Sequence, residues 1–254
     1  MTPTREKWTR NELIVAFNLY CRTPFGRIHK SNPMIIELAN RIGRTPSAVA
    51  MKMVNFASLD PTHRLRNVKG LQHGSKQDEY IWKEFHEDWQ GLASESQRVV
   101  QQLSKTLEQE EILDFSEPSV TEVERSVKVR LVQRFFRDTV LASYNFNCAL
   151  CRMSLPAMLN ASHIIPWAVN KQRRADPRNG ICLCALHDRA FDRGLITICE
   201  DFKIAVSREI KTPHASKLHR IGLLDIEGEK INLPDRFVPD PVALAYHREK
   251  IFLQ

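Results

Sequence analysis

The chain has 254 residues, of which 43% are hydrophobic and 26% are charged. These values are ordinary for a globular protein, and the length suits one large domain or two small ones. No apolar run approaches the roughly 20 residues that cross a bilayer, and the first residues, Met1–Trp8, are too polar for a signal peptide. We therefore expect a cytoplasmic protein with no membrane partner.

The formal net charge is +7, which is a modest basic excess. A basic balance suits a polyanionic partner such as nucleic acid, although a well-solvated basic surface gives the same charge count. Net charge is therefore compatible with a nucleic-acid-binding protein and equally with other soluble proteins, and only the local motifs distinguish them.

Residues 1–90 are predicted to form a small, mostly α-helical domain. Thr9 and Glu12 have the spacing of a helix-capping box, and Asn32-Pro33 and Thr45-Pro46 are typical helix starts. Gly43 ends the second helix just before the third begins, which is the pattern of helix-turn-helix proteins. A bundle that binds no DNA shows the same pattern, but we expect DNA recognition here. The candidate contacts, expected to be exposed, are Arg44, Ser47, Lys52 and Asn55.

Residues 91–120 are largely polar and are predicted to form a helical linker. Within them, Glu117-Pro118-Ser119 is a helix-breaking stretch. Thr121 and Glu124 have capping-box spacing and predict a long helix that opens a second domain over residues 121–254. Further on, Leu195–Cys199 and Phe202–Val206 alternate apolar and polar residues, which predicts a β-hairpin.

Cysteines are concentrated in this second domain. In a reducing cytoplasm they are not expected to form disulfides. Cys148-x-x-Cys151 and Cys184-x-x-His187 are two matched pairs, and together they make a Cys3His set that suits a tetrahedral, structural Zn²⁺. Cys182 falls outside this spacing and is expected to point elsewhere. The alternative is a group of buried thiols beside a surface histidine.

Four further polar residues lie in the same stretch: His163, Asn179, Asp188 and Asp192. A histidine can act as a general base near neutral pH. Asp188 and Asp192 are four residues apart, so a helix would present both carboxylates on one face, and carboxylate oxygens suit Mg²⁺ or Mn²⁺. The alternatives are an ordinary structural histidine and a solvated helix face.

Residues 144–192 resemble the HNH (ββα-metal) endonuclease family, especially its restriction-endonuclease branch. The resemblance is carried by Ser162–Trp167, Asn179-Gly180 and Leu186–Gly194. It implies that His163 is the general base and that Asn179 ties the ββα loop and orients that base.

In the family the last metal ligand lies nine positions after the asparagine, which is Asp188 here; Asp192 matches a further ligand of some members. This register leaves His187 to the zinc group. The residue before the base is often an acidic residue or histidine that binds metal, but it is Ser162 in this chain. Asp188 and Asp192 are then expected to carry the ion, unless a backbone or water ligand takes the missing place.

The expected fold is α+β: a C-terminal ββα-metal HNH nuclease domain with flanking helices, preceded by the small helical domain. The expected function is a restriction-type endonuclease that hydrolyses phosphodiester bonds of double-stranded DNA, although RNA also suits the motif. Arg173 and Arg174 are further candidate nucleic-acid contacts. One such site nicks one strand, so double-strand cleavage implies a homodimer or two sequential cuts.

Two alternatives stay open at this point. Dependence on DNA modification is a hypothesis that rests on a weak resemblance of the first half of the chain. The competing class of protein is a non-catalytic, zinc-containing DNA-binding regulator, which has no need for His163, Asn179 and Asp188 together.

Overall fold

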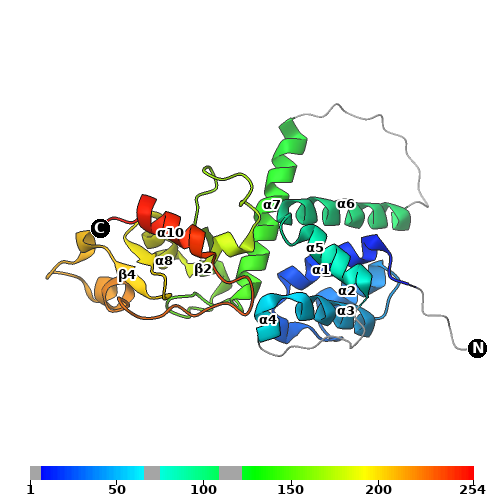
Figure 1. Cartoon of the computed structure of the whole chain (residues 1–254), viewed down its shortest axis with the longest axis horizontal. Helices are drawn as coiled ribbons and strands as arrows, with labels where there is room; N and C mark the ends of the chain where they lie inside the picture. Colours follow the sequence, from blue (N-terminus) through cyan, green and yellow to red (C-terminus); the bar gives the residue numbers. More distant parts are fainter. Residues whose placement is uncertain (1–6, 66–74, 109–121) are drawn as a thin grey trace, which may run out of the picture. The chain divides into compact units, whose positions relative to one another are not determined.

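The structure is a computed structural model and describes residues 7–65, 75–108 and 122–254. It divides into two compact units, Met1–Arg134 and Phe135–Gln254. The fold is mixed: the first unit is helical, and the second combines helices with two small antiparallel sheets (Figure 1). The unit boundary lies inside a long helix, and the division expected at residues 90 and 120 remains a prediction.

Six helices occupy the described part of the first unit before the long helix begins. They are α1 (Arg10–Arg22), α2 (Pro33–Arg41), α3 (Pro46–Leu59), α4 (Pro61–Leu65), α5 (Lys76–Phe85) and α6 (Trp89–Glu108). The three predicted helix starts are confirmed, since Thr9, Asn32 and Thr45 each accept a backbone hydrogen bond as the N-cap. Gly43, at φ +65°, follows the end of α2 as predicted.

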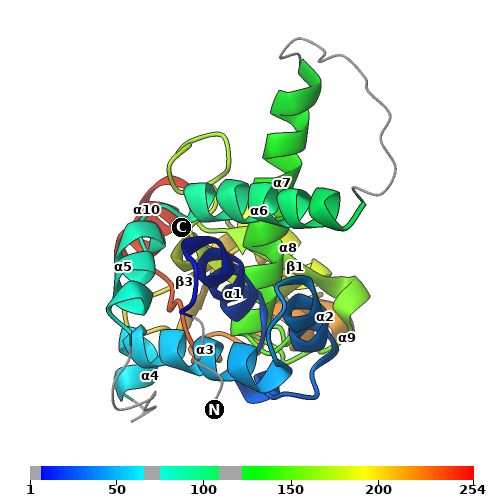
Figure 2. The ribbon, with the colours of Figure 1, turned by 90° about the vertical axis from the view of Figure 1, so that its right-hand side faces the viewer.

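Helix α1 is the centre of this unit. It contacts α2, α3, α5 and α6 (Figure 2). Aromatic rings fill the space around it: Phe17 lies with its ring centroid 4.8 Å from that of Phe56 and 5.3 Å from that of Trp82. Most residues of α1 are therefore buried, although the helix has polar ends.

Helix α6 overlaps the range predicted as a linker. It packs against α1, and Leu92 and Val99 are buried. The breaker Glu117–Ser119 and the predicted cap Thr121 lie outside the described residues. The long helix predicted after them is confirmed as α7 (Glu122–Ser143).

The second unit contains the ββα arrangement. Strand β1 (Leu159–His163) pairs antiparallel with β2 (Gly180–Cys184), and α8 (Ala185–Asp192) follows β2 directly. In the register, His163 lies opposite Gly180 and Leu159 lies opposite Cys184. The predicted hairpin is confirmed as β3 (Ile196–Ile198) and β4 (Ile204–Val206). The unit also contains α9 (Lys217–His219), a π-helical turn (Arg220–Leu224), α10 (Pro241–Lys250) and three short 3-10 turns.

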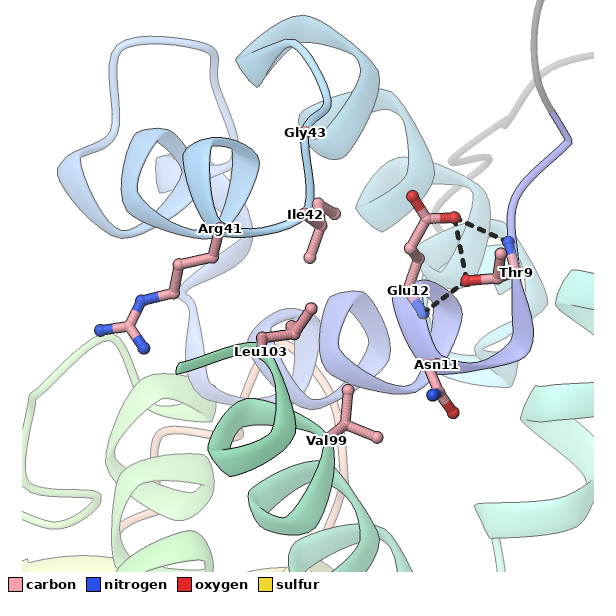
Figure 3. A pocket seen from close by; sticks show the side chains of 8 residues that line it. All are labelled: Thr9, Asn11, Glu12, Arg41, Ile42, Gly43, Val99 and Leu103. Carbon is pink, nitrogen blue, oxygen red and sulfur yellow. Dashed lines mark hydrogen bonds between the residues drawn. The ribbon is translucent and has the colours of Figure 1, made fainter. Parts of the chain in front are cut away.

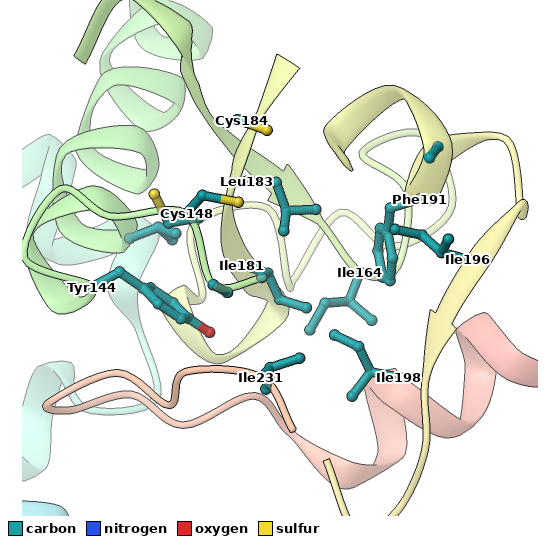
Figure 4. Close-up of a cluster of buried hydrophobic side chains, with 14 of the residues drawn as sticks. Tyr144, Cys148, Ile164, Ile181, Leu183, Cys184, Phe191, Ile196, Ile198 and Ile231 are labelled. Atoms are coloured by element: carbon teal, nitrogen blue, oxygen red, sulfur yellow. The ribbon is translucent and has the colours of Figure 1, made fainter. Parts of the chain in front are cut away.

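One apolar cluster holds these elements together. Ile164, Ile181, Leu183 and Ile198 meet at its centre, and Phe191 joins it from α8 (Figure 4). The cluster also includes Phe136, Val140 and Leu141 from the end of α7. The helix α8 is thus fixed on the core by its apolar side, which leaves its polar residues for other contacts.

The C-terminal segment closes over the end of α8. His247 of α10 stacks on Phe191 with ring centroids 3.7 Å apart, and its Nε2 donates to the Phe191 carbonyl at 3.1 Å. Leu253 donates from its backbone to the carbonyl of Gly194, just beyond α8.

None of the helices in the described part of the chain combines the length and the apolar character that a membrane span requires.

Candidate active site and metal centre

Three cysteines and one histidine converge in the second unit. Cys148 and Cys151 lie in the turn after α7, Cys184 ends β2, and His187 lies in the first turns of α8. Their ligand atoms all lie within 4.8 Å of one another. The sulfur atoms of Cys151 and Cys184 are 3.8 Å apart. Two thiolates on one tetrahedral Zn²⁺ with bonds of about 2.3 Å are also separated by about 3.8 Å. The group can therefore hold a metal ion of this size.

The histidine of this group is oriented as a metal ligand. Nδ1 of His187 lies 3.2 Å from Sγ of Cys184 and 3.4 Å from Sγ of Cys148. Its Nε2 donates to the Gly222 carbonyl at 2.8 Å. Metal-binding histidines characteristically donate one ring nitrogen to such an acceptor and use the other for the ion. Cys182, by contrast, is buried in the apolar cluster and does not belong to the group, as predicted.

The cysteines differ in their tendency to ionise. Hydrogen bonding from Cys148, and then from His187, lowers the pKa of Cys184 to about 3. A thiolate is the form of cysteine that binds a metal. The donor set thus supports a cation at this position.

The two aspartates of α8 lie one turn apart on the same side of the helix. Burial raises the pKa of the Asp192 carboxyl, and the negative charge of Asp188 raises it further. The two carboxylates are therefore close enough to repel each other, and a cation between them would relieve that repulsion. Oxygen donors of this kind suit Mg²⁺ or Mn²⁺.

Two residues of β1 hold Asp188 in place. Asn160 donates from Nδ2 to Oδ2 of Asp188 at 2.7 Å, and Ser162 donates from its hydroxyl to Oδ1. Residues two apart on a strand face the same side, so both reach the helix α8 that packs on β1. Each carboxylate oxygen of Asp188 keeps a further lone pair, which a cation can use.

His163 ends β1 and is surrounded by aromatic rings. Its ring is parallel to that of Phe136, with centroids 3.7 Å apart, and Trp167 meets it edge-on at 5.5 Å. Nε2 of His163 donates to the backbone carbonyl of Arg174 at 3.0 Å. That contact assigns the proton to Nε2 and leaves Nδ1 as the accepting nitrogen. Burial lowers the pKa of this imidazole, so it is neutral near pH 7.

Asn179 closes the loop between the two strands. It is buried, accepts a hydrogen bond from the Ile165 backbone at 2.9 Å, and donates to the carbonyls of Ile165 and Arg173 at 3.1 and 3.3 Å. The loop that it closes carries Arg174, whose carbonyl receives His163. Within the described residues, His163 and Asp188 share no hydrogen bond, whereas Ser162 and Asp188 do.

The arginines of this loop differ in their availability. Arg173 forms ion pairs with Asp240 and Asp176. Arg174 is half-buried; its Nε donates to the Trp167 carbonyl at 2.9 Å, and its guanidinium lies 4.7 Å from the Trp167 ring centroid. The terminal nitrogens of Arg174 keep donors for another partner.

The expected exposure of Lys52 and Asn55 in the first unit is wrong. Their exposed fractions are only 7% and 5%. Lys52 donates to both oxygens of Asp78 at 2.8 and 2.9 Å, and Asn55 donates to the same carboxylate at 3.2 Å. A buried lysine requires such a partner, because an unpaired charge in the interior is very costly. These two side chains are therefore parts of the core.

The other two candidate contacts of the first unit, Arg44 and Ser47, differ from each other in exposure. Arg44 pairs with Glu12 at 2.7 Å, and its guanidinium lies 5.3 Å from the Trp8 ring centroid. Ser47 is exposed in the first turn of α3. Of the four predicted contacts, Ser47 is thus the one whose side chain faces solvent.

A pocket of about 390 Å³ in the first unit is lined by residues between Thr9 and Leu103 (Figure 3). Its apolar side is made by Ile42, Val99 and Leu103. Of its polar residues, Thr9 and Glu12 bond each other in the capping box of α1, and Arg41 pairs with Glu37. The pocket contains none of the candidate catalytic residues.

Comparison with known families agrees with this geometry. Residues 148–199 match the family model described as HNH endonuclease. The segment contains the Cys3His group, both strands of the ββα arrangement and α8, and the chain therefore carries an HNH endonuclease domain in its second half. A search of curated proteins found no match.

Three residues near the site were not predicted from the sequence. Asn160 could have been identified, because it lies two residues before Ser162 and must share its strand face. Trp167 belongs to the motif, but the sequence does not indicate that its edge contacts His163 or that its face lies under Arg174. Phe136 is one of several apolar residues of α7, and nothing in its local sequence distinguishes it.

Proposed function

We propose that the chain is a DNA endonuclease in which His163 activates a water molecule to attack a phosphodiester bond. The proposal rests on the hydrogen bonding and the protonation of this histidine. Its Nε2–H is committed to the Arg174 carbonyl, and burial keeps the ring neutral. Nδ1 is then free to accept the proton that water loses during attack. A protonated histidine could not accept that proton.

The phosphate side of the reaction is assigned to Asp188 and Asp192. A divalent cation bound there would neutralise charge on the scissile phosphate and on the leaving 3′ oxygen. The residues of this chain supply the two carboxylates, and Asn160 and Ser162 hold Asp188 in one orientation. The expected products are a 5′-phosphate and a 3′-hydroxyl.

The Cys3His group has a different task in this proposal. It joins the turn after α7 to the end of β2 and the start of α8. Zn²⁺ bound there would fix the helix that carries Asp188 against the turn after α7 and the end of β2, the strand paired with the one that carries His163. His187 and Asp188 are neighbours in sequence but belong to separate sites, one structural and one catalytic.

Arg174 is the better candidate of the two loop arginines for contact with the DNA backbone. The Trp167 ring and carbonyl hold its guanidinium, while Arg173 is occupied by two carboxylates. We expect Arg174→Ala to weaken DNA binding and to lower its salt dependence, since each phosphate contact contributes a slope of about 0.9 in log K against log salt. Arg173→Ala should affect stability more than DNA affinity.

The test is cleavage of plasmid DNA in the presence of Mg²⁺ or Mn²⁺. Methylated and unmethylated plasmids are compared, because a restriction enzyme that depends on modification would cut only one of them. Wild-type protein should cut, and His163→Ala should lose at least about a hundredfold in rate. Failure of the wild type on every DNA would overturn the nuclease assignment and favour a DNA-binding regulator. Undiminished cutting by His163→Ala would overturn the assignment of the base.

A further inference from the structure

The ring of His163 is restrained in two independent ways. The parallel ring of Phe136, inclined by only 12° at a centroid distance of 3.7 Å, restricts the plane of the imidazole. The hydrogen bond to the Arg174 carbonyl restricts rotation within that plane. A planar group held in both respects points its remaining nitrogen, Nδ1, in one direction. Phe136 is therefore a neighbour of the base with a defined geometric effect on it.

Phe136 reaches this position through a space that a side chain would normally fill. His163 pairs with Gly180 in the β1–β2 register, and side chains of directly opposed residues lie on the same face of a sheet. A Cβ atom on Gly180 would lie 2.7 Å from Cζ of Phe136 and 2.5 Å from Cγ2 of Val140. Both distances are too short for any carbon contact. The Phe136 ring thus occupies the place of a side chain opposite His163.

The surroundings leave Phe136 little freedom to move away. It is 2% exposed, Val140 one turn further along α7 is 1% exposed, and both belong to the apolar cluster of the second unit. Phe136 also lies before residue 148, where the match to the HNH family model begins. The helix α7 therefore contributes to the surroundings of the base from outside the matched segment.

We propose that Phe136 is a positioning residue for His163, and that residue 180 is glycine because the Phe136 ring needs its space. This inference rests on the proposed role of His163 as general base. It adds that α7 completes the nuclease site. The matched segment alone lacks Phe136, the ring that stacks on His163.

The first experiment replaces the ring while keeping an apolar side chain of similar bulk, in Phe136→Leu and Phe136→Met. Both variants should lower kcat at least about tenfold, because small displacements of a reacting group are costly. The KM for DNA should stay within about twofold. The control is Val140→Ala, which also removes buried volume next to Gly180 but leaves the ring in place. It should lose thermal stability and keep kcat within about threefold.

Nuclear magnetic resonance of the His163 ring gives a readout that does not depend on cleavage. In the full chain, the ring protons of His163 should lie upfield of their usual shifts because of the Phe136 ring, and Phe136→Leu should abolish that displacement. Unchanged His163 signals in Phe136→Leu would overturn the inference even if the wild type cuts DNA. A wild type that cuts nothing would overturn the proposed function and leave this test of ring position intact.

The second experiment addresses the glycine. Gly180→Ala should lower both the melting temperature and kcat, since its Cβ overlaps two neighbours. Adding Phe136→Leu and Val140→Ala to Gly180→Ala removes both overlaps, so the triple variant should regain melting temperature relative to Gly180→Ala. Its kcat should stay as low as that of Phe136→Leu. Recovery of kcat in the triple variant, or full activity of Gly180→Ala, would refute the link between the glycine and the ring.

Discussion

Asn160 and Asp188 are joined by a hydrogen bond of 2.7 Å between the amide nitrogen of one and Oδ2 of the other. Ser162 donates to the second oxygen of the same carboxylate. In a related site with an acidic residue before the base, that residue would itself be a ligand. Here the strand β1 supplies neutral donors instead, and their effect is to orient the one carboxylate rather than to add a second. In the proposed site, Ser162 and Asn160 therefore support the ligand Asp188 and do not bind the cation themselves.

Asn160→Ala should therefore weaken binding of the catalytic cation. Loss of a residue that orients a metal ligand typically costs about 10- to 100-fold in metal affinity or activity. The measurement is titration of zinc-loaded protein with Mn²⁺ by calorimetry, together with the Mn²⁺ concentration that gives half-maximal cleavage. Both values should rise in Asn160→Ala by a similar factor.

Two controls separate orientation of Asp188 from a general loss of structure. Asn18→Ala removes an amide hydrogen bond of 2.9 Å to Ser96 in the other unit and should leave Mn²⁺ affinity unchanged. Combining Asn160→Ala with Asp188→Asn should weaken Mn²⁺ binding no more than Asp188→Asn alone, because the amide acts through the carboxylate. Additive effects would show that Asn160 has an independent role.

The Cys3His group should make the second unit depend on a metal ion for stability. Structural zinc sites contribute directly to folding, and the apparent binding free energy in small zinc domains is about 10–16 kcal/mol. Cys148→Ser should lose bound zinc and destabilise the unit by about 5 kcal/mol or more, measured by elemental analysis and thermal unfolding. Cys182→Ala is the matched control, since this buried thiol lies outside the group. Wild-type protein purified without zinc, yet fully folded, would contradict the assignment.

The positions of short-range features could be predicted from the sequence because local chemistry determines them. Thr9, Asn32 and Thr45 cap helices through their own side chains, and each pair of the Cys3His group is a local spacing of three residues, the second at the start of α8. The order of strand, strand and helix followed from the resemblance to HNH nucleases. These features need no knowledge of the distant packing.

The sequence does not predict the surroundings of a residue where these depend on a partner far away in the chain. The helical pattern predicts an exposed Lys52, but its ammonium group forms a buried ion pair with Asp78, 26 residues later. Phe136 and His163 are 27 residues apart and meet only because Gly180 leaves space between α7 and the sheet. Neither relationship has a local signal, since a buried ion pair and a stacked ring both depend on tertiary packing.

The Lys52–Asp78 pair leads to a prediction about stability. Removing one partner of a buried ion pair leaves an unpaired charge and costs about 3–5 kcal/mol, whereas removing both is often neutral. Lys52→Met should therefore destabilise the first unit by that amount, and Lys52→Met with Asp78→Leu should recover part of the loss. Urea unfolding measures both. Lys83→Met, at an exposed position of α5, should change stability by less than about 0.5 kcal/mol. A similarly small effect of Lys52→Met would show that the lysine is solvated after all.

His247 should make the stability of the second unit depend on pH. Burial against Phe191 lowers the pKa of His247 to about 4, from 6.5 in the unfolded chain. Between these values the unfolded state binds the proton and the folded state does not, so stability is lost as the pH falls from 6.5 towards 4. The full loss is about 3 kcal/mol, of which about 2 kcal/mol has occurred by pH 5.

The variant His247→Gln isolates this contribution. Glutamine can still hydrogen-bond Thr197 or the Phe191 carbonyl, which are the partners of His247, but it carries no titrating proton. Urea unfolding at pH 7 and pH 5 should therefore show a smaller pH dependence for His247→Gln than for the wild type, by about 2 kcal/mol. Burial also lowers the pKa of His163, but that histidine is present in both proteins and cancels in the comparison. The exposed His214 offers a control, and His214→Gln should unfold with the wild-type pH dependence. Equal pH dependence of His247→Gln and wild type would mean that His247 is charged, and hence solvated, in the folded protein.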